Sequence, residues 1–136
     1  MIVVDTNVIA HTWLPSDQKD KIKALIEKDS EWISPILWRS EFRSVLAKLI
    51  RKELISDSKA IEIADEAEGH MASREFNVPT KNVISILRKS SLSSYDSEFV
   101  ALAKIKNLNL VTLDKKIVRE FPDIAIHLDE ISNKNG

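Results

Sequence analysis

The sequence predicts an α/β fold built on a central, mainly parallel sheet of four or five strands. The first observation is an apolar run at residues 2–4, which lacks the polar alternation of a half-exposed strand. The second is a similar run at residues 108–113. The third is the chain between them, where apolar residues recur at spacings of three and four, as in helices packed on a sheet. Strands that alternate with helices favour parallel pairing.

Composition is that of an ordinary globular protein. The 136 residues are 43% hydrophobic and 30% charged, enough for one domain with a real core. A net charge of -1 argues against coating nucleic acid by bulk charge. The chain has no cysteine, which excludes thiolate metal sites, and only two glycines, which excludes glycine-rich phosphate loops. No run approaches the roughly 20 apolar residues of a membrane span, and no signal segment is evident, so we expect a cytoplasmic protein with no membrane contact.

The N-terminal strand ends at Asp5, and residues 8–14 remain apolar enough for a short turn or helix. Residues 17–28 carry apolar side chains at spacings of three and four, which predicts a short amphipathic helix with lysines on its solvated side. Residues 31–33 then predict a brief second strand.

A helix is predicted to start at Ser34 and Pro35, because serine is favoured at the N-cap and proline at the first helical position. It should extend to about Lys52. Glu41 belongs to its apolar face, since at 100° per residue it lies about 60° from Trp38. A carboxylate on a buried face is costly unless it is paired, protonated or bound to a metal. The rest of that face is Phe42, Val45 and Leu49, whereas Arg39 and Arg43 point away from it.

The middle of the chain predicts two helices separated by an extended segment. Residues 57–71 form the first, weakened near its end by Gly69. Residues 76–79 are a third strand or an extended linker. Thr80 can cap the second helix, which ends in the serine-rich segment 90–94.

Asp96 lies in the first turn of a helix that Ser93 can cap. Phe99, Val100 and Ala103 lie within about 60° of Asp96 around that helix, so Asp96 also points inward. The strand 108–113 follows and ends in Asp114, as the first strand ends in an aspartate. A helix, a last strand and a frayed tail are expected at 115–121, 124–128 and 132–136, with one domain spanning 1–131.

Four carboxylates are expected to converge on one cleft. Two of them end strands and two face inward from early helical turns; they are Asp5, Asp114, Glu41 and Asp96. The carboxyl ends of neighbouring parallel strands and the adjacent helix starts face the same crevice. The acids would repel one another there unless a divalent cation is bound, and all-oxygen ligation suits Mg²⁺ or Mn²⁺. Such a cation could activate water for phosphodiester hydrolysis. The side chains that could orient the acids are Thr6, Asn7 and Thr112.

Three of the four acids also have a purely structural explanation. Asp5 could form a turn, and Asp114 could cap the helix that follows it. Asp96 stands three residues after Ser93, which is the spacing of a capping box. Glu41 is neither at a cap nor on a solvated face, so it is the most informative of the four. The basic residues that follow the last strand-end acid could hold phosphates or form an ordinary solvated helix face; they are Lys115, Lys116 and Arg119.

These motifs resemble the PIN-domain family, especially its VapC-type toxin ribonucleases. The matching segments occur in family order over essentially the whole chain, and they are Val3-Val4-Asp5-Thr6-Asn7, Ser34-Pro35 followed by Glu41, Tyr95-Asp96 with Phe99-Val100-Ala101-Leu102-Ala103, and Leu110-Val111-Thr112-Leu113-Asp114.

The resemblance implies a three-layer α/β/α fold and a Mg²⁺- or Mn²⁺-dependent endoribonuclease acting on RNA. It also implies a homodimer and a small antitoxin partner that inserts a segment at the active site. Many relatives carry a further acid just after the last aspartate, where this chain has Lys116 and Ile117, which favours a one-metal site. By position, the family's acidic quartet is Asp5, Glu41, Asp96 and Asp114, supported by the hydroxyl of Thr112.

Two other functions compete with this one. A phosphoaspartyl domain, of the haloacid-dehalogenase-like or receiver type, also uses an aspartate at the end of a central strand. The phosphatase pattern wants a second aspartate two residues later, where this chain has Asn7. The other alternative is a catalytically silent PIN-like module that only binds a partner or RNA.

Overall fold

Five parallel strands form the centre of the part of the molecule that the computed structural model describes, residues 1–133. Their order across the sheet is β3-β2-β1-β4-β5, and the predicted parallel sheet is confirmed. The strands span Ile2–Val4 (β1), Trp32–Pro35 (β2), Glu75–Phe76 (β3), Leu110–Thr112 (β4) and Ala125–His127 (β5).

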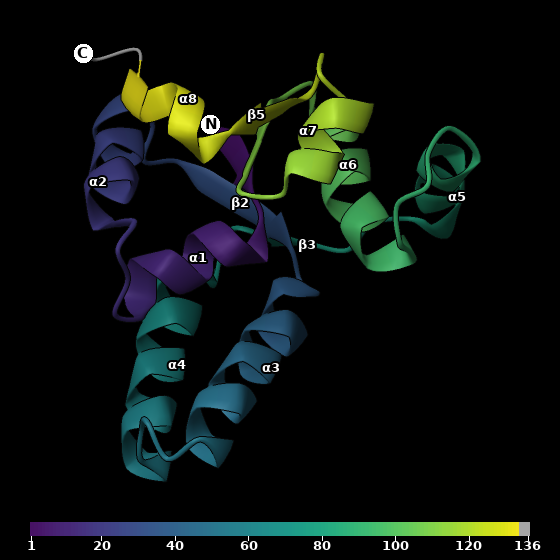
Figure 1. The fold of residues 1–136 in the computed structure, drawn as a ribbon. Helices are drawn as coiled ribbons and strands as arrows, with labels where there is room; N and C mark the ends of the chain where they lie inside the picture. Colours follow the sequence, from purple (N-terminus) through teal and green to yellow (C-terminus); the bar gives the residue numbers. More distant parts are fainter. Residues whose placement is uncertain (134–136) are drawn as a thin grey trace.

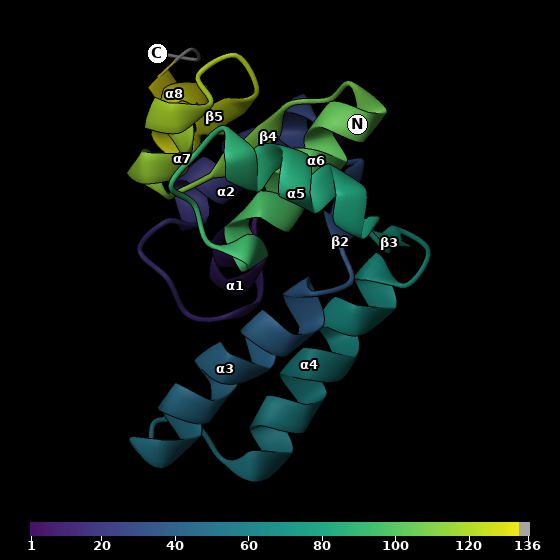
Figure 2. The ribbon, with the colours of Figure 1, turned by 90° about the vertical axis from the view of Figure 1, so that its right-hand side faces the viewer.

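Helices cover the sheet in a three-layer α/β/α arrangement, as the family resemblance implied (Figure 1). Helix α6 packs on β1, β2 and β4, with α5 packed against its other side, while α1 contacts β4 and α3. Helices α3 and α4 form an arm that extends away from the sheet in both views (Figures 1 and 2). The helices span Thr6–Trp13 (α1), Lys19–Lys28 (α2), Trp38–Arg51 (α3), Asp57–Met71 (α4), Thr80–Arg88 (α5), Ser94–Lys106 (α6), Lys115–Glu120 (α7) and Leu128–Asn133 (α8).

The two central strands, β1 and β4, lie side by side in the core. Val3 pairs with Leu110 and Val4 with Val111, and all four side chains are buried. The chain leaves β1 toward β2 on one side and leaves β4 toward β5 on the other. The crevice beyond the carboxyl ends of two such strands is where α/β sheets bind ligands. Residues 5 and 114 therefore lie at this crevice.

The predicted helix start at Ser34 and Pro35 is wrong. Both residues belong to β2, where Pro35 pairs with Phe76 and Ser34 donates its hydroxyl hydrogen bond to the carbonyl of Val4. Pairing with strands on both sides outweighed the local preference of these residues for a helix N-terminus. Helix α3 begins at Trp38 instead, without a side-chain cap. Its most buried side chains are Trp38, Phe42 and Leu46, whereas Val45 and Leu49 are half-buried.

Two further differences concern helix ends. Thr80 is the first residue of α5, and Pro79 occupies the N-cap without a side-chain hydrogen bond. The last strand ends at His127, and a helix not expected from the sequence, α8, follows it. The expected tail begins inside this helix, and its last residues, 134–136, lie outside the described part of the chain. Within residues 1–133 no helix combines the length and apolar character that a membrane crossing requires.

Candidate active site

Asp5 is held in a fixed orientation at the end of β1. It caps α1, with Oδ1 accepting a hydrogen bond from the Thr6 backbone N–H at 2.7 Å. Its Oδ2 accepts from the hydroxyl of Thr112 at 2.7 Å and from the side-chain amide of Asn7 at 3.4 Å. Only 6% of Asp5 is exposed, and burial raises its pKa to about 7 although the hydrogen bonds from Thr112 and Thr6 oppose that rise. A neutral or cation-bound carboxyl therefore suits this position.

The predicted orienting residues connect the acids. Thr112 is fully buried on β4, and its hydroxyl also accepts from the backbone N–H of Asp114 at 3.0 Å. Asn7 accepts from the backbone N–H of Leu113 at 3.2 Å. Residues on β1–α1 and on β4–α7 are thereby joined through side chains. The hydroxyl of Thr112 thus links the two strand-end acids, Asp5 and Asp114, by hydrogen bonds.

Glu41 faces the same place from the first turn of α3. Its Oε1 accepts a hydrogen bond from the hydroxyl of Thr6 at 2.7 Å. Burial, and then repulsion from Asp96, raises the pKa of Glu41. Arg39 points away from this face, as the sequence predicted, and pairs with Glu75 at 2.6 Å. The acid on the apolar face of α3 thus has a hydroxyl partner and no cationic one among residues 1–133.

Asp96 and Asp114 complete the acidic set. Ser93 caps α6, accepting from the Asp96 backbone N–H at 3.1 Å, and Asp114 caps α7, accepting from the Lys116 backbone N–H at 2.9 Å. Burial, and then repulsion from Asp114, raises the pKa of Asp96. The helix cap foreseen for Asp114 is present, whereas for Asp96 only the Ser93 half of the capping box is found among residues 1–133. Neither role removes the carboxylate from the site.

All four acids line one cleft of about 610 Å³. Thr6 and Asn7 line it as well, whereas Thr112 is buried behind Asp5. None of the four acids forms an ion pair with a basic side chain in the described part of the chain, and burial together with repulsion from neighbouring acids raises the pKa of Asp5, Glu41 and Asp96. The remaining lining residues are Leu37, Ser40, Ser44, Val45, Lys48 and Tyr95.

Comparison with protein families matches residues 2–125 to the PIN domain. The chain belongs to the PIN-domain family. It is 23% identical over 127 residues to ribonuclease VapC3 of Pyrobaculum aerophilum, covering 91% of this chain and 97% of that protein. Two solved structures share the fold: PAE2754 from Pyrobaculum aerophilum (TM-score 0.75, 16% identity, 98% and 94% of the two chains) and FitAcB from Neisseria gonorrhoeae (TM-score 0.73, 18% identity, 93% and 96%).

The donor chemistry of this PIN-domain cleft fits a divalent cation. Carboxylate and hydroxyl oxygens are hard ligands, and within residues 1–133 none of the four acids is ion-paired to a basic side chain. Within residues 1–133, no three acidic or histidine side chains stand close enough together to form a complete ligand cluster. Mg²⁺ retains several waters and takes one or two carboxylates. Direct ligation by a pair of acids with water-mediated contact to the others is compatible with this spacing.

The predicted phosphate-binding residues of α7 do not line the acidic cleft. Lys115 and Arg119 line a separate hollow of about 330 Å³ together with His127. Lys116 donates to the carbonyl of Ser91 at 3.2 Å, and its charge favours the ionised form of Asp96. A phosphate role for the three remains a prediction, and Lys116 is the one whose charge acts on an acid of the cleft, Asp96.

Sequence reasoning gave no role to three charged or aromatic residues in or near this PIN-domain site. Burial, and then repulsion from Glu41, raises the pKa of Glu98, so this carboxyl is within electrostatic reach of the site. Lys48 and Tyr95 line the cleft. Lys48 could have been found, because seven residues from Glu41 is about two helical turns and places both on one face. Tyr95 adjoins Asp96, but no spacing pattern marked it.

Proposed function

We propose that this PIN-domain protein is an endoribonuclease that hydrolyses RNA phosphodiester bonds with Mg²⁺ or Mn²⁺ as cofactor. The observation that carries the proposal is the cleft lined by four carboxylates, two from strand-to-helix turns and two from the first turns of helices, with no basic side chain paired to any of them in residues 1–133. Keeping such acids together is unfavourable without a cation. The likeness to a ribonuclease supports the reaction class.

Each residue of the proposed site has a defined task. Asp5, Glu41, Asp96 and Asp114 would hold the cation, two of them directly and the others through bound water, and the departure at Lys116 and Ile117 favours a single ion. The cation, when bound, neutralises the phosphate and lowers the pKa of an attacking water.

The supporting residues fix the geometry of the acids. Thr112 directs Oδ2 of Asp5, and Thr6 directs Oε1 of Glu41. Asn7 ties the β4–α7 turn to Asp5. Contacts of this kind commonly change metal affinity or activity 10–100-fold when they are lost.

Cleavage of single-stranded RNA tests the proposal. Cleavage should require Mg²⁺ or Mn²⁺ and stop when a chelator is added. Asp5→Asn should lower the rate by about 100-fold or more, because the cation loses a ligand. Asp65→Asn, a change at an exposed residue of α4, is the matched control and should cut at the parental rate. If Asp5→Asn cleaves as fast as the parent protein, the proposed mechanism is wrong.

We also propose that the protein is the cytoplasmic toxin of a toxin–antitoxin pair, a homodimer inhibited by a small antitoxin. This follows from the family resemblance and from the likeness to a VapC ribonuclease. Expression should be toxic to a host cell, and co-expression of an adjacent small gene should relieve the toxicity. Toxicity that persists with the neighbouring gene present would contradict the pairing, though not the nuclease activity.

The PIN-domain match over residues 2–125 does not support a phosphoaspartyl domain. A catalytically silent binding module is the remaining alternative. Calorimetry distinguishes it from the nuclease, because a silent module would bind no divalent ion.

A further inference from the structure

Tyr95 is an exposed aromatic side chain at the acidic cleft. It is the only tyrosine of the chain, it lies in the first turn of α6 beside Asp96, and 59% of it is exposed. Among residues 1–133, no hydrogen bond to its hydroxyl and no ring packed against its ring is found. A lone exposed aromatic is common on protein surfaces. One that lines the cleft of a proposed nuclease offers a flat face to whatever binds there.

Lys48 is the cation of the same cleft. It lies on α3 and is exposed, and it forms no ion pair with any side chain of the described residues. All the other charged residues that line the cleft are acids. At 1.5 Å per residue, Lys48 is about 10 Å farther along α3 than Glu41. This distance suits a phosphate next to the one being cut.

The two residues belong to different walls, Tyr95 to α6 and Lys48 to α3. The cleft volume of about 610 Å³ is in the range of sites that hold a drug-sized molecule, and a nucleotide is of that size. An aromatic face and an amine are the two groups by which proteins bind a single strand, through base stacking and through the phosphate. A base inside a duplex is stacked on both faces by its neighbours, so it cannot stack on an aromatic side chain of the protein.

We infer that Tyr95 stacks on an unpaired nucleobase and that Lys48 binds a neighbouring phosphate, so that the cleft selects single-stranded RNA. The inference rests on the proposed ribonuclease function, since it assigns the strand's contacts in the same cleft. The proposed contacts of Tyr95 and Lys48 with RNA leave the four acids of the cleft in the positions described above.

Steady-state cleavage of a short single-stranded RNA tests the stacking contact. Loss of one base–aromatic stack amounts to about 1–3 kcal/mol, so Tyr95→Ala should raise KM about 5- to 150-fold with little change in kcat. Tyr95→Phe keeps the ring and should retain the parental KM. Leu54→Ala, at a 71% exposed apolar residue between α3 and α4, is the control for losing exposed apolar surface. A parental KM in Tyr95→Ala overturns the inference.

An abasic scan gives a readout that a merely structural role of Tyr95 would not move. With the parent protein, removing the base at one position of the RNA should raise KM by the same factor as Tyr95→Ala. In Tyr95→Ala the same abasic position should cost nothing further, as in a double-mutant cycle. An abasic penalty of equal size in both proteins overturns the inference.

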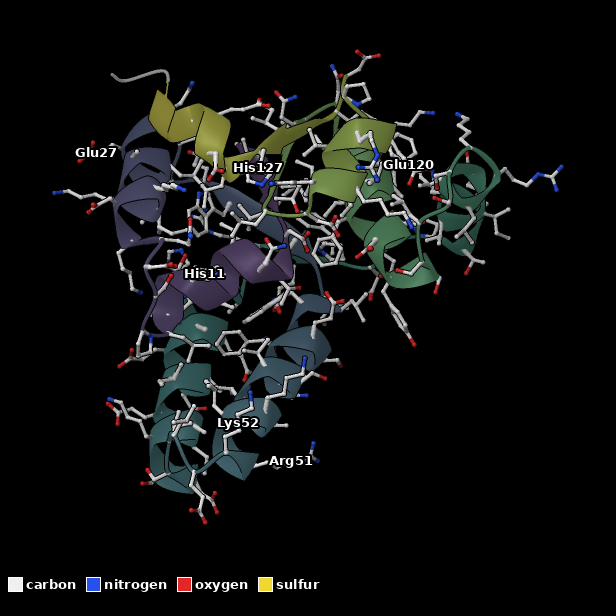
Figure 3. The ribbon with its side chains drawn as sticks, viewed as in Figure 1. His11, Glu27, Arg51, Lys52, Glu120 and His127 are labelled. Atoms are coloured by element: carbon white, nitrogen blue, oxygen red, sulfur yellow. The ribbon has the colours of Figure 1, made fainter. Side chains whose placement is uncertain are left out.

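The salt dependence of binding tests Lys48. For Lys48→Gln, the slope of log Kd against log salt, measured by fluorescence anisotropy, should shrink by about 0.7, the loss of one phosphate contact on a single strand. Lys52→Gln removes the same charge one turn later, at the far end of the α3 arm and outside the cleft (Figure 3), and should leave the slope unchanged. If Lys48→Gln and Lys52→Gln give the same slope of log Kd against log salt, the inferred contact between Lys48 and a phosphate is wrong.

The two hypotheses fail separately. If the parent protein binds RNA but never cuts it with any divalent ion, the proposed function fails, and the same variants are then compared by Kd. If the parent cuts RNA and the Tyr95 and Lys48 variants match their controls, the function stands and the inference fails.

Discussion

Asp5→Asn should make the stability of the metal-free protein much less dependent on pH. The pKa of this carboxyl is about 7 in the folded protein because of burial, against about 3.9 in an unfolded chain. The unfolded chain therefore loses its proton first as pH rises. The part of the unfolding free energy that depends on the Asp5 proton is therefore fully present below about pH 4 and is lost as pH rises toward 7.

The magnitude follows from the same two pKa values. One pKa unit corresponds to about 1.4 kcal/mol, so ionising Asp5 should cost the folded protein about 4 kcal/mol above pH 7. The asparagine has no proton to lose and should be free of this penalty. Its altered hydrogen bonds with Thr6 and Thr112 add a cost that does not vary with pH, so the slope is the quantity to compare.

Denaturant unfolding in a chelator, at steps between pH 4 and 8.5, measures the effect. The free energy of unfolding of the parent should fall relative to that of Asp5→Asn as pH rises, and Mn²⁺ should restore the parent at pH 8. Asp65→Asn should follow the parent throughout. Parallel curves for the parent and Asp5→Asn would show that Asp5 is not a desolvated acid, and the argument for a cation at this position would fail.

Three other outcomes are expected. Thr112→Val should cost about 1–3 kcal/mol of unfolding free energy by removing a buried hydroxyl with two hydrogen bonds, and Thr112→Ser should restore most of it. Arg39→Met should cost about 3 kcal/mol because it leaves the buried carboxylate of Glu75 without a cation, with only the indole N–H of Trp38 still donating to it, whereas Arg43→Met, at a 61% exposed guanidinium, should change the unfolding free energy by less than about 1 kcal/mol. Mn²⁺ at about 100 times its Kd should stabilise the parent by about 2.7 kcal/mol, and Glu41→Gln should reduce that gain in a thermal melt.

The sheet could be predicted from the sequence because its central strands are buried on both faces. Runs such as residues 2–4 and 108–113 need no tertiary information to be recognised as strands. Ser34 and Pro35 were misassigned because helix-start preferences are local, whereas strand pairing depends on β1 and β3, which are distant in sequence. Helix α8 was missed because its six residues are too few to display a helical period.

The acids of the cleft could also be predicted from local patterns, because each lies where a helix or strand begins or ends, or on the apolar face of a helix. The residues that the sequence did not reveal have no such mark. Tyr95 is an exposed residue in a helical first turn, and Glu98 is a half-buried residue whose pKa is raised by burial and by repulsion from Glu41 of another helix. No local pattern encodes which residue of a distant helix comes near.

The strand-end aspartates had seemed to require a choice between capping a helix and binding a metal, and the structure removes the need for that choice. In Asp5 one oxygen accepts from the backbone of α1, while the other is directed by Thr112. In Asp114 the cap uses Oδ1, and the same residue lines the cleft. A carboxylate that caps a helix at the end of a parallel strand is thereby oriented before any cation arrives. Capping is then the means by which the fold holds its proposed ligands in position, and a variant that keeps the cap but loses the charge, Asp5→Asn, separates the two roles.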